Sequence, residues 1–335
     1  MDKNKTLLFL GDVVPYKSFK FRNDTKTVIN LECPIIKEGI PEGGKINLRV
    51  QENYLDDIFG NNLYCVNIGN NHILDYGLDG LYSTIHELER LKTCYFGLNS
   101  SYETKYEPLI IKLSDISIAF ISAVCSSTSP LLEVGKTARL SELDEDALIQ
   151  EMSRIRLLVE RIVVYIHWGK EESSYPEPEA IKTARRLVDN GADVVVGSHA
   201  HAPQPVEKYN NGVIAYNLGN FLMPALRNIP AYFTGTGEPQ STYNKSTMPW
   251  NRISWGLAID MHSLEFKVMK YMFLNNRVIR LFITPFDRYL RLNNSLITKT
   301  DGDHISRHLR KRALYRRIRD FIYNPYVPEK LKKLL

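Results

Sequence analysis

Short, almost continuously apolar runs recur along the first two-thirds of the chain. Five of them have the length and the β-rich composition of strands buried on both faces: Thr6–Leu10, Thr27–Leu31, Tyr64–Ile68, Ile162–Ile166 and Asp193–Val196. Stretches with helical periodicity separate some of these runs. Leu81, Ile85, Leu88 and Leu91 recur every three to four residues, which predicts an amphipathic helix over Leu78–Leu91. The alternation predicts an α/β fold.

Two further helices are predicted. Pro178–Asn190 has a proline at its start and Gly191 after its end, which is typical of helix termini. Glu142–Val159 has a weaker helical pattern.

The other segments resemble antiparallel strands and loops. Two predicted hairpins join Tyr106–Leu113 to Ile116–Ser122 through Ser114-Asp115, and Val206–Tyr209 to Val213–Leu218 through Asn210-Asn211-Gly212. Further strands are predicted at Trp255–Met261, Phe266–Met272 and Arg277–Phe282. Residues Leu226–Ser254 are rich in Pro, Gly, Ser, Thr and Asn without periodicity, which predicts a long loop of functional or disordered type.

The composition is that of a soluble globular protein, with 44% hydrophobic and 24% charged residues. The chain is 335 residues long. That length allows one large domain or two modest ones. No apolar run reaches the roughly 20 residues that span a bilayer, and Leu7–Leu10 is too short for a signal-peptide core. The four cysteines form no C-x-x-C pair and lie in or beside apolar stretches. We therefore expect a cytoplasmic protein with reduced thiols and no cysteine metal site.

The net charge of +5 is concentrated at the C-terminal end, where residues 301–335 hold ten Lys/Arg and four Asp/Glu. Arg307, Arg310, Lys311, Arg312, Arg316, Arg317 and Arg319 alternate there with apolar residues. This pattern predicts a main domain over residues 1–290 and a basic, helical extension over residues 291–335. Such a helix can lie on anionic lipid, dock on its own domain or contact a biosynthetic partner. No recognition motif supports nucleic-acid binding, which we do not expect.

Polar residues with metal-binding chemistry follow the apolar runs directly. They are Asp12, Glu32, Asn70-Asn71-His72, His167 and His199-Ala200-His201. In an α/β sheet, ligands bind at the carboxyl ends of the strands, so these side chains are expected to converge. Carboxylates offset the charge of divalent ions, which can share one of them, and neutral imidazoles suit Zn, Fe and Mn. A histidine that binds no metal can protonate a leaving group. The set predicts a metal-dependent hydrolase.

Each residue alone also has an ordinary structural explanation. Asp12 fits a turn or helix cap, Glu32 a solvated strand end, and His167 a hydrogen-bonded core histidine. The His199-x-His201 pair after a buried strand is harder to explain in this way. Their joint occurrence favours a site, because metal and catalytic clusters are built from such residues.

Six motifs occur in a fixed order along the chain. They are Gly11-Asp12-Val13-Val14, Asn30-Leu31-Glu32-Cys33-Pro34, Asn70-Asn71-His72-Ile73-Leu74-Asp75-Tyr76-Gly77, His167-Trp168-Gly169-Lys170-Glu171, Gly191-Ala192-Asp193 with Gly197-Ser198-His199-Ala200-His201, and Tyr216-Asn217-Leu218-Gly219-Asn220-Phe221. Over about Thr6 to Phe282, the chain resembles the bacterial capsule-synthesis family, also called the poly-γ-glutamate synthesis (CapA-type) family. That family is related to the calcineurin-like metallophosphoesterases.

The resemblance implies a four-layer α/β/β/α metallophosphatase-like sandwich with the site at one sheet edge. It implies the metal ligands Asp12, Glu32, Asn71, His167, His199 and His201, with Glu32 in the place of a bridging aspartate. His72 would be the general acid. Five further residues would support the ligands and the acid: Asn30, Asp75, Glu171, Asn217 and Asn220. Asp75 and Glu171 would orient histidines, and Asn217 and Asn220 would fix the loop beneath the site.

The sequence departs from the wider pattern at two positions. Metallophosphoesterases usually have Asp-x-His in the first motif, and Val14 occupies the place of that histidine. Ser198 stands where family members often have a further histidine. The loss at Val14 weakens one metal position, so the expected cofactor is one or two divalent ions of Mn, Zn or Fe.

Arg49 alternates with apolar residues in Ile46–Val50, which fits a strand. It is a candidate for binding an anionic substrate group, and an ordinary exposed strand arginine is the alternative.

Together the residues and the resemblance predict a metal-dependent hydrolase, phosphoesterase-like or acting on an amide or peptide bond, in capsule or cell-surface polymer biosynthesis. Its substrate would be an anionic polymer, such as poly-γ-glutamate or a polysaccharide, or a phosphoester. The alternative is a catalytically weak or inactive protein that holds a polymer, nucleotide sugar or partner enzyme near the membrane. The expected location is the cytoplasm, including the inner face of the membrane through the basic extension.

Overall fold

The computed structural model describes residues 1–284 apart from 101–103, 130–132, 135–137, 225, 233–238, 240, 246–248 and 275–276, and it also describes residue 287. The chain divides into two units, Met1–Leu290 and Arg291–Leu335, and every described residue belongs to the first. The basic extension predicted as a helix therefore lies outside the described residues.

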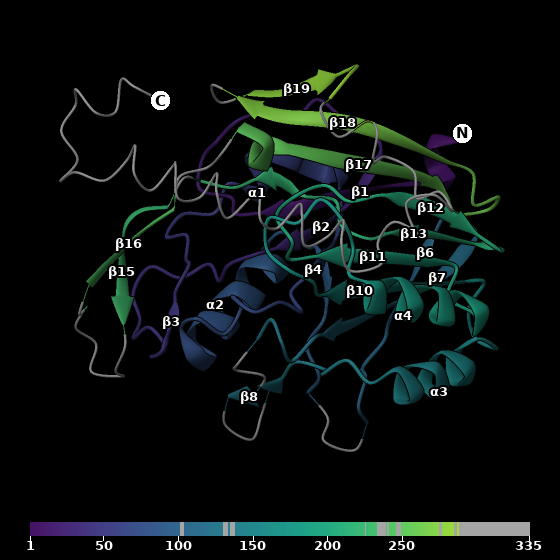
Figure 1. Cartoon of the computed structure of the whole chain (residues 1–335), viewed down its shortest axis with the longest axis horizontal. Coiled ribbons are helices and arrows are strands. Elements are labelled where there is room, and N and C mark those ends of the chain that lie inside the picture. Colours follow the sequence, from purple (N-terminus) through teal and green to yellow (C-terminus); the bar gives the residue numbers. More distant parts are fainter. Residues whose placement is uncertain are drawn as a thin grey trace. The chain divides into compact units, whose positions relative to one another are not determined.

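The larger of two mixed sheets has eight strands, in the order β19-β18-β17-β1-β2-β4-β5, with β14 pairing to β1 (Figure 1). The parallel strands are β1 (Thr6–Val13), β2 (Lys26–Leu31), β4 (Leu63–Asn67), β5 (Cys94–Phe96) and β14 (Asn220–Leu222). The antiparallel strands are β17 (Ile253–Asp260), β18 (Phe266–Leu274) and β19 (Arg277–Leu281). The parallel half of this sheet carries the residues of the first three motifs.

The smaller sheet has six strands in the order β12-β13-β11-β10-β7-β6. Its parallel centre consists of β7 (Ile116–Val124), β10 (Arg161–His167), β11 (Val194–Ser198) and β13 (Gly212–Ala215). The hairpin partners β6 (Leu109–Leu113) and β12 (Val206–Tyr209) form its two edges. Both hairpins predicted from turn residues are therefore present.

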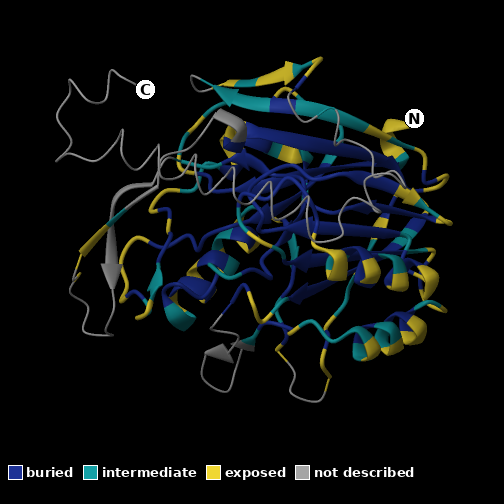
Figure 2. Cartoon of the chain, in the orientation of Figure 1, coloured by how far each residue is buried: buried dark blue, intermediate teal, exposed yellow. Residues whose placement is uncertain are grey.

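An apolar layer lies between the two sheets, and central strands such as β1, β10 and β11 are buried on both faces (Figure 2). Leu7 and Phe9 of β1 belong to this layer, whereas Leu8 and Leu10 belong to the layer on the other face. Because alternate residues of a strand point to opposite faces, a continuous apolar run buries both. The Phe9 and Tyr165 rings, from opposite sheets, are 6.3 Å apart.

Helices cover the outer face of each sheet. α1 (Leu55–Phe59) and α2 (Gly77–Arg90) pack with the apolar residues of the larger sheet, through Leu81 and Leu88 among others. On the smaller sheet, α4 (Pro178–Asp189) packs on β11 and β13, and α3 (Glu145–Ile155) packs beside α4. The layers follow the order helix, sheet, sheet, helix, and the predicted α/β class is confirmed.

The prediction of a long loop over Leu226–Ser254 was wrong. β15 (Leu226–Tyr232) and β16 (Ser241–Lys245) pair in this segment, and β15 also pairs with β3 (Lys45–Ile46). A 3₁₀ turn, η3 (Pro249–Arg252), then leads into β17. Strands with so many polar residues leave no apolar alternation in the sequence, so the pattern cannot reveal their backbone pairing.

The remaining elements are short. They are the 3₁₀ turns η1 (Lys3–Lys5) and η2 (Gly60–Asn62) and the paired strands β8 (Glu133–Val134) and β9 (Ala138–Arg139). All four cysteines are free, as predicted, and Cys33 and Cys65 are buried. Within the described part of the chain, no helix has the length and apolar character needed to cross a membrane.

Candidate metal centre

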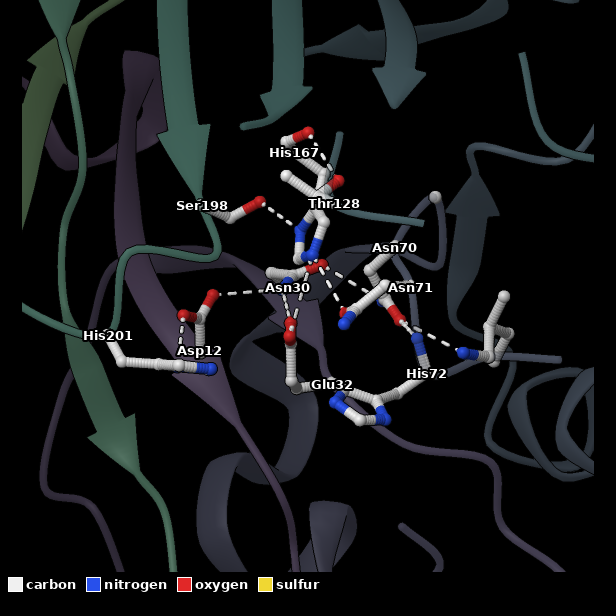
Figure 3. A network of polar contacts seen from close by, with 12 residues as sticks. Asp12, Asn30, Glu32, Asn70, Asn71, His72, Thr128, His167, Ser198 and His201 are labelled. Carbon is white, nitrogen blue, oxygen red and sulfur yellow. Dashed lines mark hydrogen bonds and ion pairs between the residues drawn. The ribbon is translucent and has the colours of Figure 1, made fainter. Parts of the chain in front are cut away.

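Six side chains at or just after strand ends form one connected cluster. We call it the metal centre because three of its residues could hold an ion. Figure 3 labels all six except His199. The six are Asp12 in β1, Glu32 after β2, Asn71 after β4, His167 at the end of β10, and His199 and His201 after β11. All except Asn71 are buried. The larger sheet supplies both carboxylates and the amide, and the smaller sheet supplies the three imidazoles. The convergence expected from the strand-end pattern is therefore present.

Three members of the metal centre have the spacing of ligands to one ion. Glu32, His167 and His199 each offer a ligand atom, and these atoms lie within 4.8 Å of one another. Two ligand atoms of a tetrahedral zinc ion, each about 2.1 Å from the metal, stand about 3.4 Å apart. A small inward shift of these side chains would therefore suit one ion.

Two buried side-chain atoms of these three residues have no hydrogen-bond partner among the described residues. They are Glu32 Oε1 and His199 Nδ1. Leaving a buried polar atom without a partner costs about 1–3 kcal/mol, so such atoms need an explanation. A divalent cation would satisfy both atoms at once, and carboxylate oxygen with imidazole nitrogen is a common donor set for Zn and Fe. The residues present therefore fit a metal ion.

His167 is held so that one ring nitrogen faces the other ligands. Its Nδ1 lies 2.9 Å from Ser198 Oγ. Its Nε2 lies 2.9 Å from Asn71 Oδ1 and 3.6 Å from Glu32 Oε1. A hydrogen bond to one imidazole nitrogen fixes the ring orientation and directs the other nitrogen to a metal.

His201 and Asp12 form a second group of donors beside the first. His201 Nδ1 lies 3.2 Å from Asp12 Oδ2 and 2.9 Å from Asn220 Oδ1. The His199 ring centroid is 4.7 Å from that of His167 and 5.9 Å from that of His201. Both residues of the His-x-His pair have positive φ angles, 88° for His199 and 52° for His201. Such backbone is strained for a histidine and is concentrated at functional sites.

Asn30 connects the two carboxylates of the metal centre. Its Nδ2 donates to Asp12 Oδ1 at 2.9 Å and to Glu32, and its Oδ1 accepts from Asn67 at 2.9 Å and from Asn70 at 3.2 Å. An aspartate here could not donate to either carboxylate. The amide thus orients both acids without adding negative charge.

His72 lies outside the set of close ligands and has its own carboxylate partner. Its Nδ1 is 2.7 Å from Asp75 Oδ2, which also accepts from the backbone N of Leu48 at 2.5 Å. Lys45 Nζ is 2.5 Å from Asp75 Oδ1 and donates to the backbone carbonyl of Asn71. Asp75 is fully buried, and Lys45 offsets its charge. The His72 side chain is 12% exposed, so a substrate can reach it.

The environment of the three candidate ligands shifts each of their pKa values toward the uncharged form. Burial, reinforced by the charge of Asp12, raises the pKa of Glu32 well above its usual value. Burial and the neighbouring histidines lower the pKa of His167, and burial is also the main reason that the pKa of His199 falls to about 3. Neutral imidazole is the form that binds metal. A cation would also favour the charged form of Glu32.

The raised pKa of Glu32 gives a prediction for the chelated protein. The pKa of Glu32 is near 4.5 in the unfolded chain and higher in the folded protein. The folded state is therefore favoured by the protonated carboxyl at pH values below 4.5, and this contribution is lost as the pH rises through the folded pKa. Gln at this position mimics the neutral form, so Glu32→Gln should match the wild type near pH 4.5 and exceed it at pH 8. Each unit of pKa shift corresponds to about 1.4 kcal/mol. Urea unfolding with chelator at both pH values measures the difference, and equal stabilities at pH 8 would contradict it.

The other predicted residues have identifiable places. Asn217 accepts from the Gly219 backbone N at 2.8 Å, in the loop beneath the site, and the charge of Glu171 acts on Glu32 and His199. Arg49 is exposed. Its guanidinium lies 5.1 Å from the Tyr76 ring centroid and donates to the Lys37 carbonyl at 3.1 Å. The role of Arg49 in substrate binding stays a prediction.

The sequence analysis did not identify three residues whose contacts position the side chains of the site. They are Lys45, Asn67 and Asn251. Asn67 ends β4, so the strand-end signal used for the other residues could have found it. Asn251 donates to the His201 carbonyl at 3.2 Å, and its own carbonyl accepts from Asn220 at 3.0 Å. Lys45 and Asn251 do not follow an apolar run, and only the folded chain brings them to the site.

These observations define an α/β protein with a buried carboxylate–imidazole cluster where the strands of two facing sheets end. The family described as "Bacterial capsule synthesis protein PGA_cap" matches residues 9–225, and the chain belongs to this family.

Two relatives have sequences similar to this chain. The "PGA biosynthesis protein CapA" of Bacillus subtilis (strain 168) is 28% identical over 205 residues, covering 60% of this chain and 54% of its own length. The "Capsule biosynthesis protein CapA" of Bacillus anthracis is 25% identical over 201 residues, covering 58% and 49%. The chain thus spans about half the length of these curated relatives.

Solved structures with some similarity include two nucleotidases. The 5'-nucleotidase precursor of Thermus thermophilus is 16% identical, with a TM-score of 0.38 over 88% of this chain and 57% of that one. The NAD nucleotidase of Haemophilus influenzae is 14% identical, with a TM-score of 0.33 over 75% and 46%.

Proposed function

We propose that this chain is a metal-dependent hydrolase that cleaves a phosphoester bond during the synthesis or modification of a capsule or another cell-surface polymer. The observation that carries the proposal is the buried Glu32–His167–His199 cluster, in which Glu32 Oε1 and His199 Nδ1 have no hydrogen-bond partner among the described residues. Membership of the capsule-synthesis family supports the polymer setting, and the name of the Bacillus subtilis relative suggests poly-γ-glutamate as the polymer. The cleavage of an amide or peptide bond is the alternative reaction.

Glu32, His167 and His199 would hold the first ion, with Asn71 beside them. A divalent ion bound there would polarise a phosphoryl oxygen and lower the pKa of a water molecule. Asp12 and His201 would form part of a second position. Val14 is buried among apolar side chains and adds no ligand next to Asp12, so the first position has the more complete donor set.

His72 is the proposed proton donor to the leaving group. Asp75 engages its Nδ1 at 2.7 Å, which leaves Nε2 as the nitrogen that can carry a proton to substrate. Lys45 and the Leu48 backbone hold Asp75 in place, so the imidazole has a fixed orientation. Positioned general acids contribute about 10²–10⁴-fold to rate.

The full chain loaded with Mn or Zn is expected to hydrolyse aryl phosphates, and His72→Ala should reduce kcat by about 100-fold or more on phenyl phosphate. The reduction should be smaller on p-nitrophenyl phosphate, whose leaving group needs little protonation. The metal content should stay at the wild-type level, because His72 is not among the close ligands. His262→Ala, which removes an exposed histidine, is the matched control. Equal losses on both substrates would argue against proton donation by His72.

A binding protein without catalysis is the second candidate, and the buried Val14 in place of a metal ligand favours it. In that case the metal-loaded chain would bind an anionic polymer or nucleotide sugar without turning over phosphoester or amide substrates. If no metal binds at micromolar concentration, the hydrolase proposal fails.

A further inference from the structure

A small third sheet connects two segments that lie far apart in the sequence. Its strand order is β16-β15-β3, and we call these three strands the arm (Figure 1). β15 pairs antiparallel with β16 and also with Lys45 and Ile46, which form β3. Tyr232 is the register partner of Lys45. Strand pairing therefore fixes the backbone position of Lys45.

Two residues that flank the β15–β16 hairpin in the chain contact His201. Asn220, in the strand before the hairpin, has its Oδ1 2.9 Å from His201 Nδ1. Asn251, in the 3₁₀ turn after the hairpin, donates to the His201 carbonyl at 3.2 Å, and its own carbonyl accepts from Asn220 at 3.0 Å. The hairpin is therefore anchored at the Asp12–His201 side of the metal centre.

Lys45 connects the arm to the other side of the metal centre. Figure 3 shows His72 and His201 on opposite sides of the cluster. The ammonium group of Lys45 pairs with Asp75 at 2.5 Å and donates to the backbone carbonyl of Asn71. Asp75 in turn engages His72 Nδ1 at 2.7 Å. The arm thus reaches the loop of the proposed acid through one side chain.

The Lys45–Asp75 ion pair is buried, with the two side chains 10% and 0% exposed. Taking both charges out of water costs free energy, and replacing such a pair with apolar residues is often neutral or stabilising. Stability alone therefore does not account for a lysine at this position. A lysine that reaches both the Asp75 carboxylate and the Asn71 carbonyl does fix the distance between them.

We propose that the arm positions the acid: β15 holds β3, and Lys45 of β3 holds the Asn71–Asp75 loop so that His72 faces the leaving group. The inference rests on the proposed function, because His72 donates a proton only if the site cleaves a bond. The arm acts through Asp75 and His72 and not on the reacting atoms. An error of about 1 Å in the place of a reacting group costs up to about 100-fold in rate, so loss of the arm should slow the reaction without removing a metal ligand.

Removal of the β15–β16 hairpin tests the proposal. Leu226 and Lys245 are register partners at its base, so residues 227–244 can be replaced with Asn-Gly, which suits a two-residue turn. In the otherwise full chain loaded with metal, this excision should lower kcat on phenyl phosphate about tenfold or more. The loss should be smaller on p-nitrophenyl phosphate, whose leaving group needs little protonation. Metal content shows whether the excised chain is folded.

Lys45→Met should give the same dependence on the leaving group, and it tests the proposal even if the excised chain does not fold. The substitution keeps most of the length of the side chain and removes its charge and its donors. Combined with the excision, Lys45→Met should lower kcat by no more than about twofold further, because both changes release the same loop.

Lys270→Met is the matched control. The Lys270 side chain is 15% exposed, pairs with Asp287 at 2.6 Å and donates to the Phe282 carbonyl at 2.9 Å, so it has the same two kinds of contact as Lys45. None of these three residues belongs to the metal centre or to the arm. The kcat of this variant should stay within about twofold of wild type on both substrates.

Equal losses on both substrates, or losses that add in the combined variant, would overturn the proposal, because an arm that only contacts substrate or stabilises the fold gives those results. Hydrogen–deuterium exchange gives a readout without turnover. Residues 70–76 should exchange about tenfold faster in the excised chain and in Lys45→Met, and at the wild-type rate in Lys270→Met. A wild type without turnover contradicts the proposed function, and unchanged exchange in both arm variants would separately overturn the support of the loop by the arm.

Discussion

Glu32→Gln is expected to weaken metal binding by the full chain about 100-fold or more. Glu32 is the only carboxyl group among the three candidate ligands, and the two others are buried imidazoles whose pKa values are lowered. An amide has the same shape but no charge to offset a divalent cation, and changes even to residues that only support ligands cost about 10–100-fold in metal affinity. His199→Ala should weaken metal binding by a similar factor, because it removes Nδ1, a buried nitrogen that has no hydrogen-bond partner among the described residues.

Metal content after dialysis against Zn or Mn, and the thermal midpoint with and without metal, measure this effect. An ion at 100 times its Kd stabilises the folded state by about 2.7 kcal/mol, and this gain should be missing in both variants. His262→Ala should retain it. Glu32→Gln should therefore be less stable than wild type with metal and more stable in chelator at pH 8. If both variants still bind a full complement of metal, the ion does not bind at Glu32 and His199.

Most residues of the metal centre obey one simple rule in the sequence. Asp12, Glu32 and His167 each lie at or just after the end of a continuous apolar run, and such runs form parallel strands whose ends meet. The apolar run itself reveals the strand, because a strand buried on both faces needs no alternation. The same rule locates His199 and His201 after β11.

The sequence could not predict which residues of the two sheets contact each other. Asp12 comes from the larger sheet and His201 from the smaller one, and they meet at 3.2 Å only because the two sheets face each other. Likewise, Lys45 comes from β3, a strand of two residues, which is too short to leave a periodic signal. Asn251 follows a segment whose strands have no apolar alternation. These contacts depend on how layers and connections pack, which local pattern does not encode.

Gly11→Ala is expected to destabilise the protein by about 3 kcal/mol or more, near the upper end of overpacking effects. A Cβ at Gly11 would lie 1.8 Å from the backbone oxygen of Gly219, and no flexible side chain is there to move aside. That same oxygen accepts a 2.9 Å hydrogen bond from the backbone N of Asp12, where β1 pairs with β14. Relieving the clash must therefore separate the strands that carry Asp12 and Asn220.

Gly44→Ala separates this clash from the general effect of replacing a glycine. Gly44 has a φ of 79°, and a Cβ there would meet no atom within 4 Å, so only backbone strain of about 1–2 kcal/mol applies. Urea unfolding in chelator compares the two variants, and metal affinity is measured on folded protein. The Gly11 variant should also bind metal more weakly, since Asp12 and His201 move with the separated strands. If the two variants have equal free energies of unfolding, β1 and β14 can separate without a loss of stability. The proposed clash between a Cβ at Gly11 and Gly219 would then not explain why a glycine precedes Asp12.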